Sequence, residues 1–216
     1  MKNGQVRAFL FDLDGTLVDS KLDLTKSVNE MLRELGRAAL DAELVASYVG
    51  HGAPQLIASA LGAASTEEER REGLTIFLKH YERNKLEKTR AFPGVVDGLR
   101  MLEGTPMAVL SNKPTKMSRE ILEGLGLAHY FVGVYGGDSF EKKKPDPVGA
   151  LAILKELGAT PGEAAMVGDS DVDVQTARNA GMLAVAVTYG FGKHDKKNNR
   201  ADVYVGSLTE LAKGRS

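Results

Sequence analysis

The sequence predicts an α/β protein with a parallel sheet of about six strands and helices on both faces. Three observations support this class. Short apolar runs alternate with helical patterns along most of the 216 residues. Several runs are too continuously apolar to have one face in water, as is typical of strands buried on both sides. One early stretch carries helical patterns only, which predicts an all-helical insertion after the first strand in a chain long enough for one domain and a smaller addition.

The predicted strands are short aliphatic and β-branched runs. The helical patterns between them open after a proline or a serine and close at a glycine, as helices with a left-handed final residue do. We expect strands at VRAFLFD (6–12), PMAVLS (106–111), FVGVYGG (131–137), AAMVGD (164–169), LAVAVT (183–188) and DVYVG (202–206), and helices at 95–104, 114–126, 145–158 and 171–181.

The insertion is expected between Leu17 and Leu86, where the sequence shows no convincing strand. Four helical patterns fill it: LTKSVNEMLRELG (24–36), DAELVASYVG (41–50), APQLIASALG (53–62) and TEEERREGLTIFLKHYERNK (66–85).

Composition argues against several classes of partner. The net charge is −1 and the 28 basic residues are spread along the chain, which argues against a nucleic-acid or anionic-membrane surface. No apolar run reaches the length of a membrane span, and MKNGQVRAFLFD lacks the features of a secretory signal. The absence of cysteine excludes disulfides and thiolate metal sites and permits a reducing compartment. We predict a cytoplasmic protein; its oligomeric state is not predicted.

Two acids directly follow the first predicted strand. Asp12 ends the run and Asp14 lies two residues on, with Gly15 allowing a sharp turn behind them. Ligands of open parallel sheets bind beyond the carboxyl ends of the strands. Two close carboxylates repel each other unless a cation lies between them, and hard oxygen ligands favour Mg²⁺. The alternative is a turn at Asp14-Gly15 with Asp12 as a strand-end cap.

A second group of acids strengthens the metal hypothesis. Asp169 ends the strand at 164–169 as Asp12 ends the first, so both carboxylates are expected at one edge of the sheet. Asp171 and Asp173 begin the next helix, and we interpret Asp171 as an acid that complements the helix dipole.

Polar residues at two further places could hold or offset anionic charge. Ser111 and Asn112 end another strand, and Lys144 precedes a proline that fixes the backbone. The alternative for Lys144 is an exposed lysine in a basic run.

Taken together, DLDGT, a Ser-Asn at a strand end, a Lys-Pro and a GD-x-x-x-D resemble the haloacid dehalogenase superfamily, in order and spacing over nearly the whole chain. The resemblance implies a Rossmann-like core formed by residues 1–16 and 87–216, with a helical cap at 17–86. It also implies Mg²⁺ as the cofactor and a small phosphorylated substrate.

The resemblance implies a role for each motif residue. Asp12 would be the nucleophile that forms an aspartyl-phosphate, and Asp14 would act as general acid and then as general base. Lys144 would neutralise nucleophile and phosphate charge, while Ser111 would hold a phosphoryl oxygen with Asn112 beside it. Dehalogenases of the superfamily do not need an acid at the position of Asp14, because a halide leaves unprotonated. The acid at this position therefore argues for phosphate chemistry.

The same resemblance implies the metal ligands. Asp12, Asp169 and the backbone carbonyl of Asp14 would bind Mg²⁺, and Asp173 would support the site from behind its ligands.

Within the superfamily the chain looks most like the phosphoglycolate phosphatases, which implies 2-phosphoglycolate as substrate. Gly50, His51 and Gly52 would lie on a cap loop above the phosphate and meet a small carboxylate. The resemblance leads us to expect a different polar residue at position 51, so His51 departs from the pattern. The alternative is that His51 is a solvated turn residue. Lys113 could face either substrate or solvent. The stretches that carry this likeness are YVGHGAPQLI (48–57), LSNKP (110–114), GGDSFEKKKPDP (136–147) and VGDSDVDVQTARNAG (167–181).

Alternative functions remain open at this point. A phosphomutase of the β-phosphoglucomutase type would use Asp12 similarly and return the phosphoryl group to a sugar. A pyrophosphatase or another phosphomonoesterase of the superfamily is a further alternative. A binding or regulatory protein without turnover is disfavoured by the complete set of acids.

Overall fold

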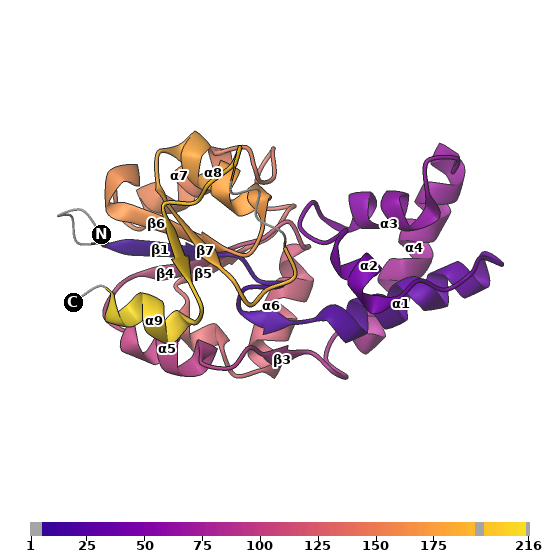
Figure 1. Cartoon of the computed structure of the whole chain (residues 1–216), viewed down its shortest axis with the longest axis horizontal. Coiled ribbons are helices and arrows are strands. Elements are labelled where there is room, and N and C mark those ends of the chain that lie inside the picture. The colour runs from indigo at the N-terminus through magenta and orange to yellow at the C-terminus, as the bar shows by residue number, and fades with distance from the viewer. Residues whose placement is uncertain (1–5, 193–196, 215–216) are drawn as a thin grey trace.

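The computed structural model describes residues 6–192 and 197–214, and in this part of the chain the predicted parallel sheet is present (Figure 1). Its six strands lie in the order β5-β4-β1-β6-β7-β8, and all neighbours run parallel. Each of the six runs expected from the sequence contains one strand. The strands are β1 (Ala8–Phe11), β4 (Met107–Leu110), β5 (Gly133–Tyr135), β6 (Ala164–Gly168), β7 (Leu183–Val187) and β8 (Val203–Val205).

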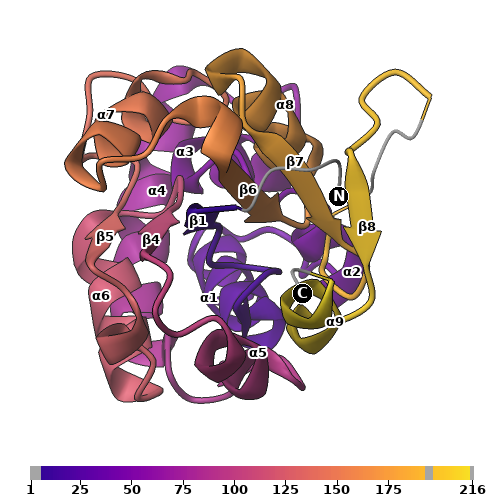
Figure 2. The ribbon, with the colours of Figure 1, turned by 90° about the vertical axis from the view of Figure 1, so that its left-hand side faces the viewer.

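Helices cover both faces of this sheet, as the apolar runs predict (Figure 2). Phe9 and Phe11 of β1 pack on one face with α5, α6 and α9. Ala8 and Leu10 point to the other face and pack with α7 and α8. The helices are α5 (Val95–Met101), α6 (Thr115–Gly124), α7 (Val148–Glu156), α8 (Asp171–Ala180) and α9 (Leu208–Lys213).

The ends of α8 illustrate how the sequence sets the local structure. The side chains of Ser170 and Asp173 form a capping box at its start, and Gly181 ends it in a left-handed conformation with φ 74°. Among the described helices, none is both long and apolar enough to cross a membrane.

The predicted insertion forms a separate helical cap beyond the carboxyl edge of the sheet (Figure 1). Val28 and Met31 of α1 and Phe77 of α4 are buried in its interior. The longest cap helix, α4, begins at a capping box between Thr66 and Glu69. The cap helices are α1 (Lys21–Glu34), α2 (Ala42–Ala46), α3 (Ala53–Leu61) and α4 (Glu67–Asn84).

The expectation of no strand between Leu17 and Leu86 is wrong. β2 (Val18–Asp19) pairs antiparallel with β3 (Arg90–Ala91) at the base of the cap. A strand of two residues shows no periodicity, and its partner lies far along the chain, so the sequence pattern carries no signal for it. The helix α9 and the 3₁₀ turns at Ala128–Tyr130 and Pro161–Glu163 were also not expected. The exact division of core and cap after residues 16 and 86 stays a prediction.

Candidate active site

Three neighbouring strands deliver polar side chains to one edge of the sheet. Asp12 follows β1, Ser111 follows β4 and Asp169 follows β6, and the three strands are adjacent in the order β4-β1-β6. All three side chains are buried. The parallel topology therefore brings together the strand ends that the sequence singles out.

The acids form a compact group at this edge. Oxygens of Asp12, Asp169 and Asp173 all lie within 4.8 Å of one another. Burial raises the pKa of Asp12 to about 6, with a lowering contribution from Lys144 and a raising one from Asp173. Burial, with the charges of Asp173 and Asp12, raises the pKa of Asp169 to about 7. Burial first, and repulsion between neighbouring carboxylates second, therefore disfavour the ionised forms of these acids.

Lys144 lies within this acidic group and is only 3% exposed, so the alternative of a solvated lysine is wrong. Its Nζ is 3.0 Å from Asp12 Oδ1 and 2.6 Å from Asp173 Oδ1. Burial lowers the pKa of Lys144, but the two carboxylates outweigh it and raise the pKa overall. The other oxygen of Asp173 accepts from the backbone N–H and the hydroxyl of Ser170. The two carboxylate oxygens of Asp173 therefore hold Lys144 and Ser170 in place.

A loop that the sequence reading did not assign to the site holds Asp169. Asp169 Oδ2 accepts from the backbone N–H groups of Phe191 and Gly192, each at 2.8 Å. A Cβ on Gly190 would lie 2.2 Å from the carbonyl oxygen of Gly15, so only glycine fits there. Backbone donors carry no residue signature, which is why this loop was missed.

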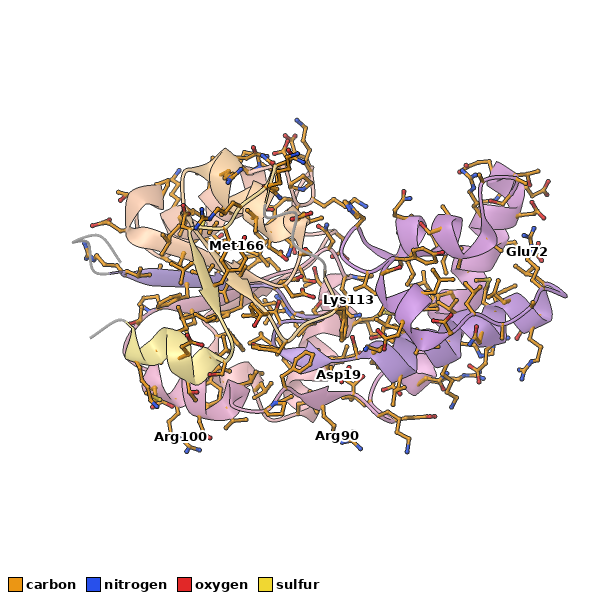
Figure 3. The ribbon with its side chains drawn as sticks, in the orientation of Figure 1. Asp19, Glu72, Arg90, Arg100, Lys113 and Met166 are labelled. Atoms are coloured by element: carbon orange, nitrogen blue, oxygen red, sulfur yellow. The ribbon has the colours of Figure 1, made fainter. Side chains whose placement is uncertain are left out.

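Asp14 faces a different set of partners from the acidic group. Its Oδ1 accepts from the hydroxyl of Ser20 at 2.5 Å, and its Oδ2 is 2.8 Å from Lys113 Nζ. The Lys113 ammonium also donates to the hydroxyl of Tyr81 at 2.9 Å and lies 4.4 Å from the centre of that ring. Lys113 is therefore buried at the boundary of core and cap and does not face solvent (Figure 3).

The loop at residues 50–52 reaches from the cap to the core. Asn112 Nδ2 donates to the backbone oxygens of Gly50 and Lys144, each at 2.9 Å. Lys143 Nζ donates to the backbone oxygen of His51 at 2.7 Å. The His51 side chain is exposed, so its contact with the core is made by its backbone.

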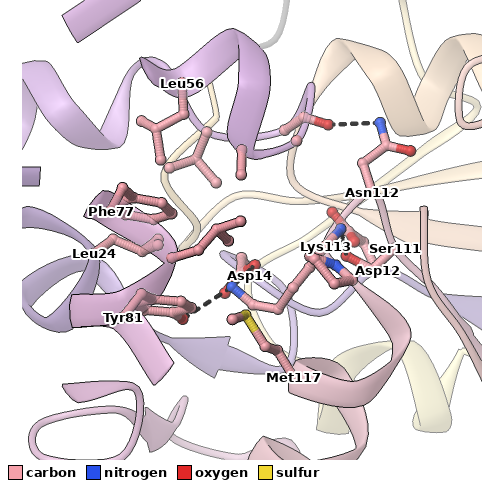
Figure 4. Close-up of a pocket in the computed structure, with 16 residues that line it drawn as sticks. Asp12, Asp14, Leu24, Leu56, Phe77, Tyr81, Ser111, Asn112, Lys113 and Met117 are labelled. Carbon is pink, nitrogen blue, oxygen red and sulfur yellow. Dashed lines mark hydrogen bonds and ion pairs between the residues drawn. The ribbon is translucent and has the colours of Figure 1, made fainter. Parts of the chain in front are cut away.

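A pocket separates this edge from the cap, and its two sides differ in character (Figure 4). The core side is mostly polar, with Pro114 and Met117 as its apolar members, whereas the cap side is mostly aliphatic and aromatic. The sequence reading missed the cap side, because Phe77 and Tyr81 lie four residues apart on α4 and are indistinguishable from core positions by spacing. The pocket is lined by Asp12, Asp14, Leu24, Val49, Gly50, Gly52, Ala53, Leu56, Phe77, Leu78, Tyr81, Ser111, Asn112, Lys113, Pro114 and Met117.

The acidic group fits a metal site. Its ligand atoms are hard oxygens, which Mg²⁺ prefers. In the described part of the chain, Lys144 forms the ion pairs of Asp12 and of Asp173. Burial and the neighbouring carboxylates raise the pKa values of Asp12 and Asp169, and a bound cation would stabilise the ionised forms of both acids. Asp14 contributes no carboxylate to this group, whereas Asp173 does.

The fold and this site define a hydrolase with an α/β core and a helical cap. Residues 9–187 match the haloacid dehalogenase-like hydrolase family. The chain belongs to that family.

Several relatives with full-length similarity to this chain share one name. The chain is 39% identical to a phosphoglycolate phosphatase of Chromobacterium violaceum, with 95% of each chain covered. It is 37% identical to a phosphoglycolate phosphatase of Vibrio parahaemolyticus, covering 98% of this chain and 96% of the other. A crystal structure of a predicted phosphoglycolate phosphatase from Haemophilus somnus is 30% identical, with a TM-score of 0.90 over 99% of this chain and 100% of the other. The chain is thus a phosphoglycolate phosphatase-like hydrolase.

Proposed function

We propose that the protein is a Mg²⁺-dependent phosphatase that hydrolyses 2-phosphoglycolate through an aspartyl-phosphate on Asp12. The observation that carries this proposal is the buried Asp12 carboxylate, 3.0 Å from Lys144 and grouped with Asp169 and Asp173. The substrate is inferred from the names of the full-length relatives. The small-molecule partner and the cytoplasmic location expected from the sequence remain part of the proposal.

In the first step a carboxylate oxygen of Asp12 attacks phosphorus, and the bond from phosphorus to the ester oxygen breaks. Lys144 offsets the charge of the nucleophile, and the Ser111 hydroxyl binds a phosphoryl oxygen beside Asn112. Asp12 and Asp169 would bind Mg²⁺ together with the backbone carbonyl of Asp14. When bound, the metal would supply positive charge that offsets the charge of the phosphate oxygens.

Asp14 serves the leaving group in this scheme. Its carboxylic acid gives a proton to the ester oxygen as glycolate leaves. The resulting carboxylate then takes a proton from the water that attacks the aspartyl-phosphate, which releases phosphate and restores both acids. The bond from Ser20 holds the Asp14 side chain in place for both transfers.

The test is phosphate release from a panel of phosphomonoesters, including 2-phosphoglycolate and hexose phosphates, with Mg²⁺ or with a chelator. We expect turnover of 2-phosphoglycolate that stops on chelation and falls by about 10³-fold or more in Asp12→Asn. A variant that keeps a near-normal rate refutes Asp12 as nucleophile. Interconversion of hexose phosphates with little release would instead support the phosphomutase alternative.

A further inference from the structure

The pair Lys113–Tyr81 has no part in the scheme above, although it lies in the pocket (Figure 4). Lys113 comes from the core directly after Asn112, and Tyr81 comes from α4 of the cap. Both side chains are buried, at 8% and 1% exposure. The phenol oxygen accepts from the ammonium and keeps its own proton as a second donor. The pair therefore presents donors at the junction of core and cap.

The position of Asp14 places this pair beside the leaving group. The ester oxygen must lie within hydrogen-bond reach of Asp14 to receive its proton. Lys113 Nζ is 2.8 Å from that same carboxylate. In a phosphorylated 2-hydroxy acid the carboxylate carbon is two bonds from the ester oxygen. A carboxylate on the leaving group is therefore within reach of Lys113.

Elsewhere in the pocket, the described lining residues offer a carboxylate no cationic side chain. Among the described residues that line the pocket, Lys113 is the only cation, while Asp12 and Asp14 are acids. The cap side is formed by side chains such as Leu24, Leu56 and Phe77. A carboxylate placed against these groups without a cation would lose its hydration with no compensation.

We propose that Lys113, supported by the Tyr81 hydroxyl, binds the carboxylate of the leaving group and so selects carboxylated phosphomonoesters. The ammonium exchanges its contact with Asp14 for the substrate carboxylate when substrate binds. This inference rests on the proposed phosphatase function and names the residue that sets its specificity.

The test compares 2-phosphoglycolate with an ester in which a neutral hydroxymethyl group replaces the carboxylate. The kcat/KM values for 2-phosphoglycolate and for 2-hydroxyethyl phosphate are measured with Mg²⁺, and their ratio is the discrimination of the enzyme. We expect the unmodified protein to prefer 2-phosphoglycolate by at least about tenfold. In Lys113→Met the ratio should fall by at least about tenfold, mainly through the KM for 2-phosphoglycolate, and Lys113→Arg should restore part of it.

Two further variants separate recognition from structure. Lys116→Met removes an exposed lysine from the first turn of α6, where it pairs with Glu82, and should leave the ratio unchanged. Tyr81→Phe keeps the ring and the lysine charge and should lower the ratio by about threefold. If Lys113 had a purely structural role, its substitution would slow the hydrolysis of both esters equally and leave the ratio of their kcat/KM values unchanged.

The outcomes distinguish this inference from the proposed function. If the unmodified protein hydrolyses both esters equally well, or if the ratio survives Lys113→Met and Lys113→Gln, the inference is wrong and the phosphatase function stands. If the unmodified protein hydrolyses neither ester, the proposed function itself fails. Lys113→Gln and Lys113→Arg replace Lys113→Met if that variant does not fold, and equal kcat/KM values for the two esters in the unmodified protein overturn the inference without any variant.

Discussion

The two sides of the pocket are built in different ways. The polar side comes from adjacent strand ends of one sheet. Asp12 there belongs to a buried group in which Asp169 and Lys144 are held by short contacts to other core residues. The apolar side comes from cap helices and meets the core through the loop at residues 50–52 and the contact between Lys113 and Tyr81. This difference suggests that the strand ends of the core fix the chemistry, and that the junction of core and cap, where Lys113 meets Tyr81, selects the molecule to which it is applied.

The largest expected effect comes from removing Lys144, the cation of the buried acidic group. Lys144→Met leaves Asp12 and Asp173 buried against each other with no lysine between them. We expect kcat/KM to fall by about 10²-fold or more, and the free energy of unfolding of the metal-free protein to fall by about 3–5 kcal/mol. Phosphate release and urea denaturation in chelator measure these two quantities.

Lys142→Met is the matched control for that prediction. Lys142 lies two residues away, is 63% exposed in its side chain and pairs with Asp146 at 3.3 Å. Its loss should cost less than about 1 kcal/mol and leave the rate unchanged. Equal effects of the two substitutions would mean that the buried network contributes no more than a surface pair.

The second prediction concerns the pH dependence of stability without metal. The pKa of Asp12 is raised to about 6 and that of Asp169 to about 7 in the folded protein, against an ordinary value of 3.8. Between pH 4 and 7 the folded state therefore holds protons that the unfolded state has lost, so stability falls as the pH rises. In chelator, the melting temperature should drop by roughly 5 °C from pH 5 to pH 8.

Two comparisons test the cause of that slope. Mg²⁺ should raise the melting temperature more at pH 8 than at pH 5, because it binds the ionised carboxylates. Asp169→Asn should flatten the slope, which separates its contribution from that of the four histidines. A slope unchanged in Asp169→Asn would show that the acidic group does not control it.

The same difference between the two sides explains what could be predicted from the sequence. Apolar runs that end in acids predict where Asp12 and Asp169 meet, because parallel strands place their carboxyl ends at one edge. The contact between Lys113 and Tyr81 joins residues 32 positions apart through the packing of α4 on the core, and no local pattern encodes it. The backbone donors at Phe191 and Gly192 and the two-residue strand β2 escape prediction for a related reason, since neither depends on side-chain type or period.

The smallest expected effect tests how the loop at residues 50–52 contributes. His51 meets the core through its backbone oxygen while its side chain is exposed, so His51→Ala should change kcat/KM for 2-phosphoglycolate by no more than about twofold. Gly52 has φ +87° and a Cβ there would lie 3.0 Å from the backbone oxygen of Asn112. Gly52→Ala should therefore displace the loop and raise KM by about tenfold. If His51→Ala had the larger effect, the imidazole would contact the substrate, and the leaving group would be recognised by this cap loop as well as by Lys113.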